Sequence, residues 1–106
     1  MKILAVTACP SGVAHTYMAA EALEKAAKAK GIEIKVETQG SIGIENKITM
    51  DDVKDADVVI LTKDIGIKET ERFNGLPTVK VGVSDVVKKS DQIIDKVEAY
   101  INSKKQ

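Results

Sequence analysis

A single cysteine stands near the start of the chain, between a short apolar run and a segment rich in alanine and glutamate. Where a parallel strand leads into a helix, backbone N–H groups converge on the connecting loop and bind anions. A thiolate there is stabilised as a nucleophile, and the same N–H groups would bind a phosphoryl group on its sulfur. A lone cysteine is more often a buried apolar residue, but Pro10, Ser11 and Gly12 are typical of a polar turn. The pattern therefore predicts that Cys9 is a nucleophile.

Three chemistries would suit a thiol in such a loop. Redox exchange usually requires a second cysteine three positions later, where the chain has Gly12. A cysteine phosphatase requires an arginine six positions later to bind the phosphoryl group through two N–H donors, and that residue is His15. A phosphoryl relay needs N–H donors but no group that promotes attack by water. The absent arginine favours relay over hydrolysis; the alternatives are a phosphatase or arsenate-reductase-like enzyme and a flavodoxin-like module that binds a phosphate ligand.

Alternating strands and helices are predicted around this loop. Residues 3–6 and 58–61 are continuously apolar, as in strands covered on both faces. Residues 32–36 and 79–83 alternate apolar with other residues, which indicates one exposed face or a sheet edge. Helices are expected at residues 16–30, 49–55 and 84–101, with one helical turn at 68–73. Thr49, with Asp52 three positions later, and Ser84 are the expected N-caps of the second and third helices.

This order of elements predicts a three-layer α/β/α sandwich with a four-stranded parallel sheet, similar to half of a Rossmann or flavodoxin fold. Right-handed crossovers give the strand order 2-1-3-4, with the two continuously apolar strands in the centre and the alternating strands at the edges. The strand order then reverses between strands 1 and 3. Ligands of open α/β sheets bind beyond the strand C-termini at such a point. The loop that carries Cys9 leaves strand 1 there.

The composition excludes several classes of protein. The chain has 106 residues, enough for one domain (residues 1–106) with a substantial core. Sixteen basic residues balance sixteen acidic ones and aromatic residues are few, so no nucleic-acid partner is expected. No segment reads as a signal peptide or a membrane span, and so no direct membrane insertion is expected. A single cysteine fits a reducing cytosol.

The segment TACPSGVAHTYMAAEAL (residues 7–23) resembles the phosphocysteine loop of the fructose-family enzyme IIB of the bacterial phosphoenolpyruvate-dependent sugar phosphotransferase system (PTS). The resemblance continues through VETQGSIG, ADVVIL and ERFNGLP and covers nearly the whole chain. It implies a phosphotransferase without a cofactor or metal, in which Cys9 takes a phosphoryl group from a phosphohistidine of enzyme IIA. The acceptor would be fructose or a related hexose bound to the membrane enzyme IIC, through which this cytoplasmic protein would reach the membrane.

The phosphate-binding residues that this resemblance implies follow the cysteine without a break. They are Pro10, Ser11, Gly12, Val13, Ala14, His15 and Thr16. Their backbone would face the phosphoryl oxygens, Gly12 would allow close approach, and the hydroxyls of Ser11 and Thr16 would add donors.

Other side chains are expected to have structural roles. His15 is expected to cap or pack a helix more than to act as a base or second phosphoryl acceptor. Arg72, the only arginine, is expected in a surface ion pair more than in phosphate steering. Met18 is expected in apolar packing. Residues 39–41 are expected on the same edge as Cys9, as an ordinary turn or as a partner contact, and Asp64 in a solvated loop.

Overall fold

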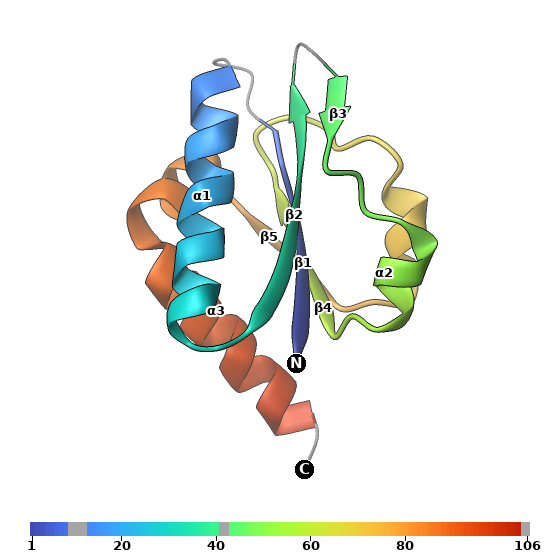
Figure 1. The fold of residues 1–106 in the computed structure, drawn as a ribbon, viewed down its shortest axis with the longest axis vertical. Coiled ribbons are helices and arrows are strands. Elements are labelled where there is room, and N and C mark those ends of the chain that lie inside the picture. Colours follow the sequence, from blue (N-terminus) through green and yellow to red (C-terminus); the bar gives the residue numbers. More distant parts are fainter. Residues whose placement is uncertain (9–12, 41–42, 105–106) are drawn as a thin grey trace.

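The computed structural model describes residues 1–8, 13–40 and 43–104. The strands are β1 (Lys2–Thr7), β2 (Glu33–Gly40), β3 (Gly43–Glu45), β4 (Val58–Thr62) and β5 (Thr78–Val81). The helices are α1 (Val13–Ala29), α2 (Met50–Lys54) and α3 (Val83–Lys104), with a 3₁₀ helix η1 (Thr70–Phe73). Figure 1 shows α1 and α3 on one face of the sheet and the short α2 on the other. The three-layer arrangement is therefore confirmed.

The strand order of the sheet is β3-β2-β1-β4-β5. Strands β2, β1, β4 and β5 are parallel, which confirms the four predicted strands and their order. The prediction missed β3, which runs antiparallel to β2. Three residues are too few to show an alternating pattern. Because β3 covers β2, the expectation that both alternating strands lie at the edges is right for β5 and wrong for β2.

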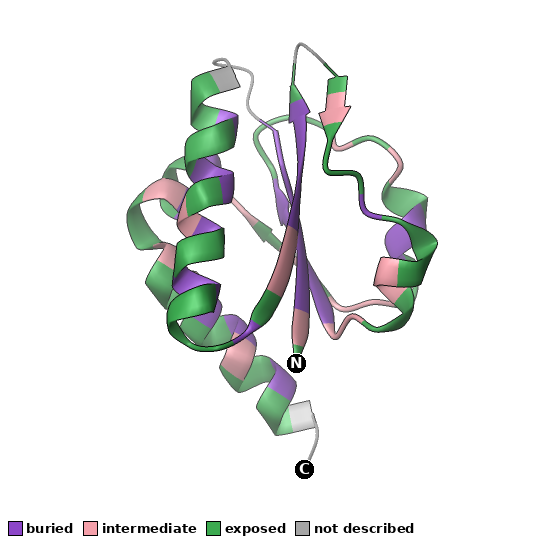
Figure 2. Ribbon diagram, viewed as in Figure 1, coloured by how far each residue is buried: buried purple, intermediate pink, exposed green. Residues whose placement is uncertain are grey.

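The two faces of the sheet pack into separate apolar cores. Ile3 and Ala5 of β1 contact the core beneath α1 and α3, together with Leu23. Leu4 and Val6, which point the opposite way, belong to the core on the other face; its further members include Ile48, Val59, Leu61 and Phe73. In Figure 2 the buried residues follow the central strands and the inner sides of the helices. Burial on both faces explains why residues 3–6 are apolar without interruption.

The N-terminus of α3 differs from the prediction. The helix begins at Val83, so Ser84 lies inside it and is not its N-cap. Instead, the Asp64 carboxylate accepts a hydrogen bond of 2.8 Å from the Val83 N–H. This contact satisfies one of the N–H groups that every helix leaves without an intrahelical acceptor. Asp64 is exposed in a loop, as predicted, and it also caps α3, which the sequence did not indicate.

The N-terminus of α2 confirms the predicted cap. The Thr49 hydroxyl accepts a hydrogen bond from the Asp52 N–H (3.2 Å), and the Asp52 carboxylate accepts one from the Thr49 N–H (2.9 Å). Lys35 Nζ of β2 donates to the same carboxylate at 2.6 Å. The hydrogen bond from Lys35 and those from Thr49 hold the pKa of Asp52 well below its usual range. Asp52 thus joins α2 to the sheet.

We expect Asp52→Asn to lower the free energy of unfolding at pH 7 by about 1 kcal/mol, because it weakens a charge-assisted hydrogen bond. The lowered pKa means that the Asp52 contribution is complete above the unfolded pKa of about 3.9 and is lost as the pH falls below it. The stability difference between the native chain and the variant should therefore shrink below about pH 4. Urea unfolding at several pH values measures this, with the exposed neighbour Asp51→Asn as control. A difference that stays constant with pH would contradict the prediction.

Candidate functional site

The predicted nucleophile and three of the predicted phosphate-binding residues lie outside the described residues. These four positions, residues 9–12, connect Ala8, which follows β1, to Val13, the first residue of α1. Figure 1 shows β1 ending and α1 beginning at the same end of the molecule, where β2 also ends. The residues on either side of the Cys9 segment therefore lie at the C-terminal edge of the parallel strands, as predicted.

Ala8, the residue before Cys9, is held by a side chain of the neighbouring strand. Its N–H donates to Thr62 Oγ1 at 2.9 Å, and Thr62 Oγ1 donates to its carbonyl oxygen at 3.2 Å. Ala8 and Thr62 are both buried. Thr62 is the last residue of β4. The strand order reverses between β4 and its neighbour β1. One hydroxyl thus satisfies both backbone polar groups of Ala8 at the predicted switch point.

The residues after the Cys9 segment are held by a second threonine. Thr7 Oγ1, at the end of β1, donates to the Thr16 carbonyl oxygen in α1 at 3.1 Å. Thr16 is 1% exposed, and its own Oγ1 is the one buried side-chain polar atom of the described residues that has no hydrogen-bond partner. Leaving a buried hydroxyl unpaired costs about 1–3 kcal/mol. Thr16 therefore has an unused donor in the first turn of α1.

The first turn of α1 also favours an anion electrostatically. It contains no acidic residue, whereas the first turns of α2 and α3 do. Partial positive charge from the peptide dipoles collects at such a turn. Ala14 and His15 are exposed there, so His15 does not pack in the core, and its capping role stays a prediction. With no carboxylate in this turn, the helix supplies its positive end to whatever binds beside it.

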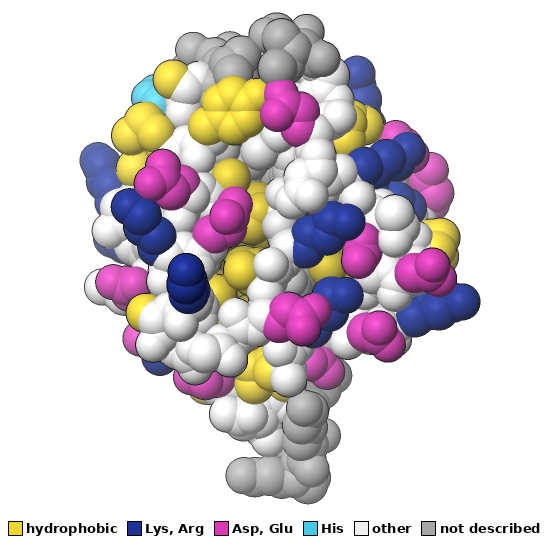
Figure 3. Space-filling model, viewed as in Figure 1, with side chains coloured by type: hydrophobic (Ala, Val, Ile, Leu, Met, Phe, Trp, Pro, Cys, Tyr) yellow, Lys and Arg dark blue, Asp and Glu magenta, His cyan; other side chains and the backbone are white. Residues whose placement is uncertain are grey.

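Apolar side chains are exposed next to this turn. Tyr17 is 38% exposed, and Met18, which was expected in core or loop packing, lies in α1 and is 50% exposed. The Tyr17 hydroxyl donates to the Glu45 carboxylate, which connects α1 to β3. In Figure 3 hydrophobic side chains are visible close to the grey atoms at this end of the molecule.

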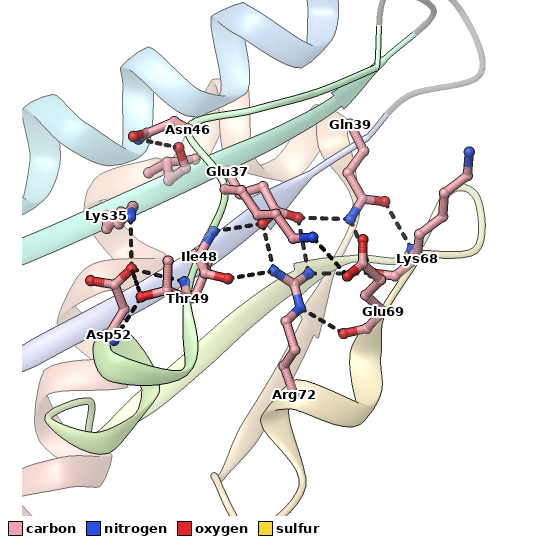
Figure 4. Close-up of polar contacts among 12 residues, drawn as sticks. Lys35, Glu37, Gln39, Asn46, Ile48, Thr49, Asp52, Lys68, Glu69 and Arg72 are labelled. Carbon is pink, nitrogen blue, oxygen red and sulfur yellow. Dashed lines mark hydrogen bonds and ion pairs between the residues drawn. The ribbon is translucent and has the colours of Figure 1, made fainter.

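Arg72 is buried and not in a surface ion pair as expected. Its side chain forms two hydrogen bonds with the Glu37 carboxylate, at 2.7 and 3.0 Å, and Glu37 is fully buried in β2. The remaining N–H groups donate to three backbone carbonyls, those of Ile48, Lys68 and Glu69. Figure 4 shows the guanidinium between these acceptors.

This arrangement occupies all five N–H donors of the guanidinium. Arg72 is also the only arginine in the chain. No arginine fork is therefore available to bind a phosphoryl group, and neither phosphate steering by Arg72 nor an arginine-dependent phosphatase mechanism is supported.

The Glu37 carboxylate stays ionised despite its burial. Burial by itself would raise its pKa, but hydrogen bonds from Arg72, Gln39 and the Ile48 N–H, with the Arg72 charge, outweigh that cost and lower it. The pair connects β2 to the segments before α2 and around η1. Its role is to fix those segments on the sheet.

Gln39 has a structural role that the sequence did not indicate. Its side-chain amide accepts from the Lys68 N–H at 2.8 Å and donates to the Lys68 carbonyl at 3.1 Å, as a neighbouring strand would. Gln39 is 7% exposed and lies within β2. It is thus neither an ordinary turn residue nor an exposed partner contact. Gly40, the exposed end of β2, does lie at the predicted edge, and Ser41 falls outside the described residues.

Sequence reasoning missed Thr7, Thr62 and Glu37. The two threonines end the two central strands, directly after continuous apolar runs. A hydroxyl at the end of a strand that is buried on both faces needs a hydrogen-bond partner. The position of each threonine could therefore have indicated a structural contact. Glu37 occupies a strand position in an alternating segment, where the pattern indicated an exposed face.

Comparisons with known proteins agree with this geometry. The family model described as "PTS system, Lactose/Cellobiose specific IIB subunit" matches residues 4–96. A relative from Escherichia coli K12, "PTS system fructose-like EIIB component 2", is 70% identical over 94% of each chain. A "PTS system fructose-specific EIIABC component" from Bacillus subtilis is 48% identical over 90% of this chain, which corresponds to 15% of that protein.

Among solved structures, the enzyme IIB subunit of a PTS system from Escherichia coli K12 superposes with a TM-score of 0.91. It is 40% identical in sequence, and the alignment covers 99% of this chain and 97% of the other. The similarity in fold and in sequence therefore extends over nearly the whole chain. The chain belongs to the fructose-type enzyme IIB family of the sugar phosphotransferase system, in which it is a phosphotransferase that relays phosphoryl groups.

Proposed function

We propose that Cys9 is the residue that carries the phosphoryl group, and that residues 10–16 bind it. The observation that supports this best is the buried Thr16 hydroxyl, which lacks a partner in the first turn of α1. The turn adds the positive end of the helix and no competing carboxylate. The residue before Cys9 is held at the point where the strand order reverses. These features suit a loop that binds a phosphoryl group on a thiol.

The proposed donor is a phosphohistidine of enzyme IIA. The sulfur of Cys9 attacks phosphorus, the sulfur–phosphorus bond forms as the phosphorus–nitrogen bond breaks, and the thiol proton passes to the released imidazole. In the second step a sugar hydroxyl attacks phosphorus, the sulfur–phosphorus bond breaks, and the hydroxyl proton returns to the thiol. Phosphoryl transfer needs mainly positioning and stabilisation of charge, which a helix N-terminus provides.

The proposed acceptor is fructose or a related hexose held by the membrane enzyme IIC. Relatives of this chain have "fructose-like" or "fructose-specific" in their names, and in the Bacillus subtilis relative the matching segment is part of an EIIABC chain. None of the helices among the described residues has both the length and the apolar character needed to cross a bilayer. We propose that the chain is one cytoplasmic domain that meets the membrane through enzyme IIC.

A labelling experiment tests the proposal. With labelled phosphoenolpyruvate, the general phosphotransferase proteins and enzyme IIA, the chain should acquire one phosphoryl group, which mass spectrometry should locate on Cys9. No label on the chain, with enzyme IIA shown to be phosphorylated, would refute the proposed donor. Label at a residue other than Cys9 would refute the proposed carrier.

The variant Thr16→Val tests the observation on which the proposal is based. Because the hydroxyl has no partner in the unmodified chain, replacing it with a methyl group of similar shape should leave the free energy of unfolding unchanged or raise it. The same change removes a donor to the phosphoryl group, and we expect phosphoryl uptake to slow about tenfold. Thermal unfolding and the labelling rate measure the two effects. A destabilised variant that is labelled at the native rate would show that Thr16 is only structural.

A further inference from the structure

We infer that Thr62 is a positioning residue for phosphoryl transfer, and that it acts through the peptide group preceding Cys9. This inference rests on the proposed role of Cys9. It assigns a function to a side chain on β4 that is far from Cys9 in sequence and does not belong to residues 10–16. Thr62 is 2% exposed, so it acts by fixing the backbone and not by contact with a partner in solution.

The hydrogen bonds at Ala8 carry the inference. The Ala8 carbonyl belongs to the planar peptide group that links Ala8 to Cys9. Thr62 Oγ1 donates to this carbonyl at 3.2 Å and accepts from the Ala8 N–H at 2.9 Å. A side-chain hydroxyl thus holds both sides of the last residue before the nucleophile. A valine in the same place would fill similar space but would leave both backbone groups without these bonds.

Thr62 is itself attached to a rigid frame. It pairs with Val81 in the ladder between β4 and β5, and the next residue, Lys63, donates its N–H to the Val81 carbonyl at 2.8 Å. Asp64 then caps α3 through the Val83 N–H. The hydroxyl therefore connects Ala8 to β5, at the opposite edge of the sheet from β3, and to α3.

Thr7 fixes the first turn of α1, shortly after the Cys9 segment, independently of Thr62. The Thr7 hydroxyl donates to the Thr16 carbonyl at 3.1 Å across the nine positions that separate the two residues in the chain. Two buried hydroxyls thus hold the backbone immediately before and shortly after residues 9–12. A relay must present its thiol to two different partners in turn. Fixed attachment points reduce the ordering that each encounter would otherwise require.

The test compares Thr62→Val with Thr62→Ser, which keeps the hydroxyl and loses a methyl group. We expect Thr62→Val to slow phosphoryl uptake from enzyme IIA and delivery to the sugar by a similar factor, about 10-fold to 100-fold. The KM for enzyme IIA should stay near the native value, and Thr62→Ser should restore most of the rate. All rates are measured at a temperature well below the midpoint of thermal unfolding of each variant.

Two control variants separate positioning from stability. Thr38→Val removes a hydroxyl from the buried β2 residue that is paired in register with Thr7 and that takes no part in the hydrogen bonds at Ala8 and Thr16. Val97→Ala weakens the packing of α3 in the apolar core, away from the edge of the sheet where β1 and β4 end. Both should be labelled at rates near the native one.

The outcomes distinguish this inference from the proposed function. If the native chain is not labelled on Cys9, the proposed function fails. If the native chain is labelled and folded Thr62→Val reacts at the native rate, or if Val97→Ala slows as much as Thr62→Val at equal stability, the positioning role of Thr62 is refuted. A selective rise in KM for enzyme IIA would also refute it, because it would indicate a docking effect.

Discussion

The variant Cys9→Ser is expected to take up no phosphoryl group from enzyme IIA under conditions that label the native chain completely. Serine has a similar shape, but its hydroxyl is not ionised near neutral pH, whereas a thiol beside a helix N-terminus is readily converted to the thiolate. The second half of the relay should be lost as well, because no phosphoryl group is available for the sugar. Label transfer and sugar phosphorylation measure the two steps separately.

A matched control shows whether such a loss is specific. Met50 is 57% exposed on α2, on the face of the sheet opposite α1, and Met50→Ala should be labelled like the native chain. Circular dichroism and thermal unfolding should show that Cys9→Ser is folded. Full labelling of folded Cys9→Ser would refute Cys9 as the carrier and would leave His15, the only histidine in the chain, as the next residue to test.

The largest effect on stability is expected from Arg72→Met. This change removes the partner of a fully buried carboxylate, together with hydrogen bonds to three backbone carbonyls. Breaking a buried ion pair from one side costs about 3–5 kcal/mol, out of a total stability of about 5–15 kcal/mol for a typical domain. Urea unfolding of the native and variant chains measures the difference.

The pH dependence gives this prediction a distinctive sign. In the native chain the pKa of Glu37 is lowered, so its contribution is complete above the unfolded pKa of about 4.3 and is lost as the pH falls below it. In Arg72→Met, burial without the guanidinium should raise the pKa of Glu37 above the unfolded value. That variant should therefore become more stable as the pH falls from 7 towards 5, where the native chain should not.

The double variant Glu37→Gln/Arg72→Met completes the comparison. A neutral amide in place of the unpaired carboxylate should recover part of the lost stability and remove the gain at low pH. If Arg72→Met lost less than about 1 kcal/mol and had the pH profile of the native chain, the buried pair would have no structural importance. The conservative variant Arg72→Lys should also destabilise, because one ammonium cannot replace a fork that serves five acceptors.

Much of the fold could be predicted because its signals are local in the sequence. The unbroken apolar run at residues 3–6 required a strand covered on both faces, and it lies at the centre of the sheet between two cores. The cap formed by Thr49 and Asp52 lies within four consecutive residues, and the sequence pattern predicted it. In contrast, β3 is too short to have a pattern, and the cap of α3 comes from Asp64 in a different loop.

The location of the candidate site was also predictable from local signals. The order of strand, Cys9 loop and helix places the loop at the reversal of strand order, and the structure places Ala8 and α1 there. The residues that hold this edge together were not predictable. Glu37 reads as the polar face of an alternating strand and Arg72 as a surface cation, because a sequence shows each charge without its partner.

Three properties could be inferred without the structure: the nucleophile to be tested, the helix that follows it, and the family to which the chain belongs. These properties depend on residue types and on spacings of a few positions. Three features emerged only in the folded chain. Thr62 holds Ala8 and Thr7 holds the Thr16 carbonyl, Thr16 has an unpaired hydroxyl, and Arg72 has no donor left for phosphate. Each of these depends on which distant groups become neighbours, because a hydrogen bond in a buried site is set by geometry across the sheet and not by distance along the chain.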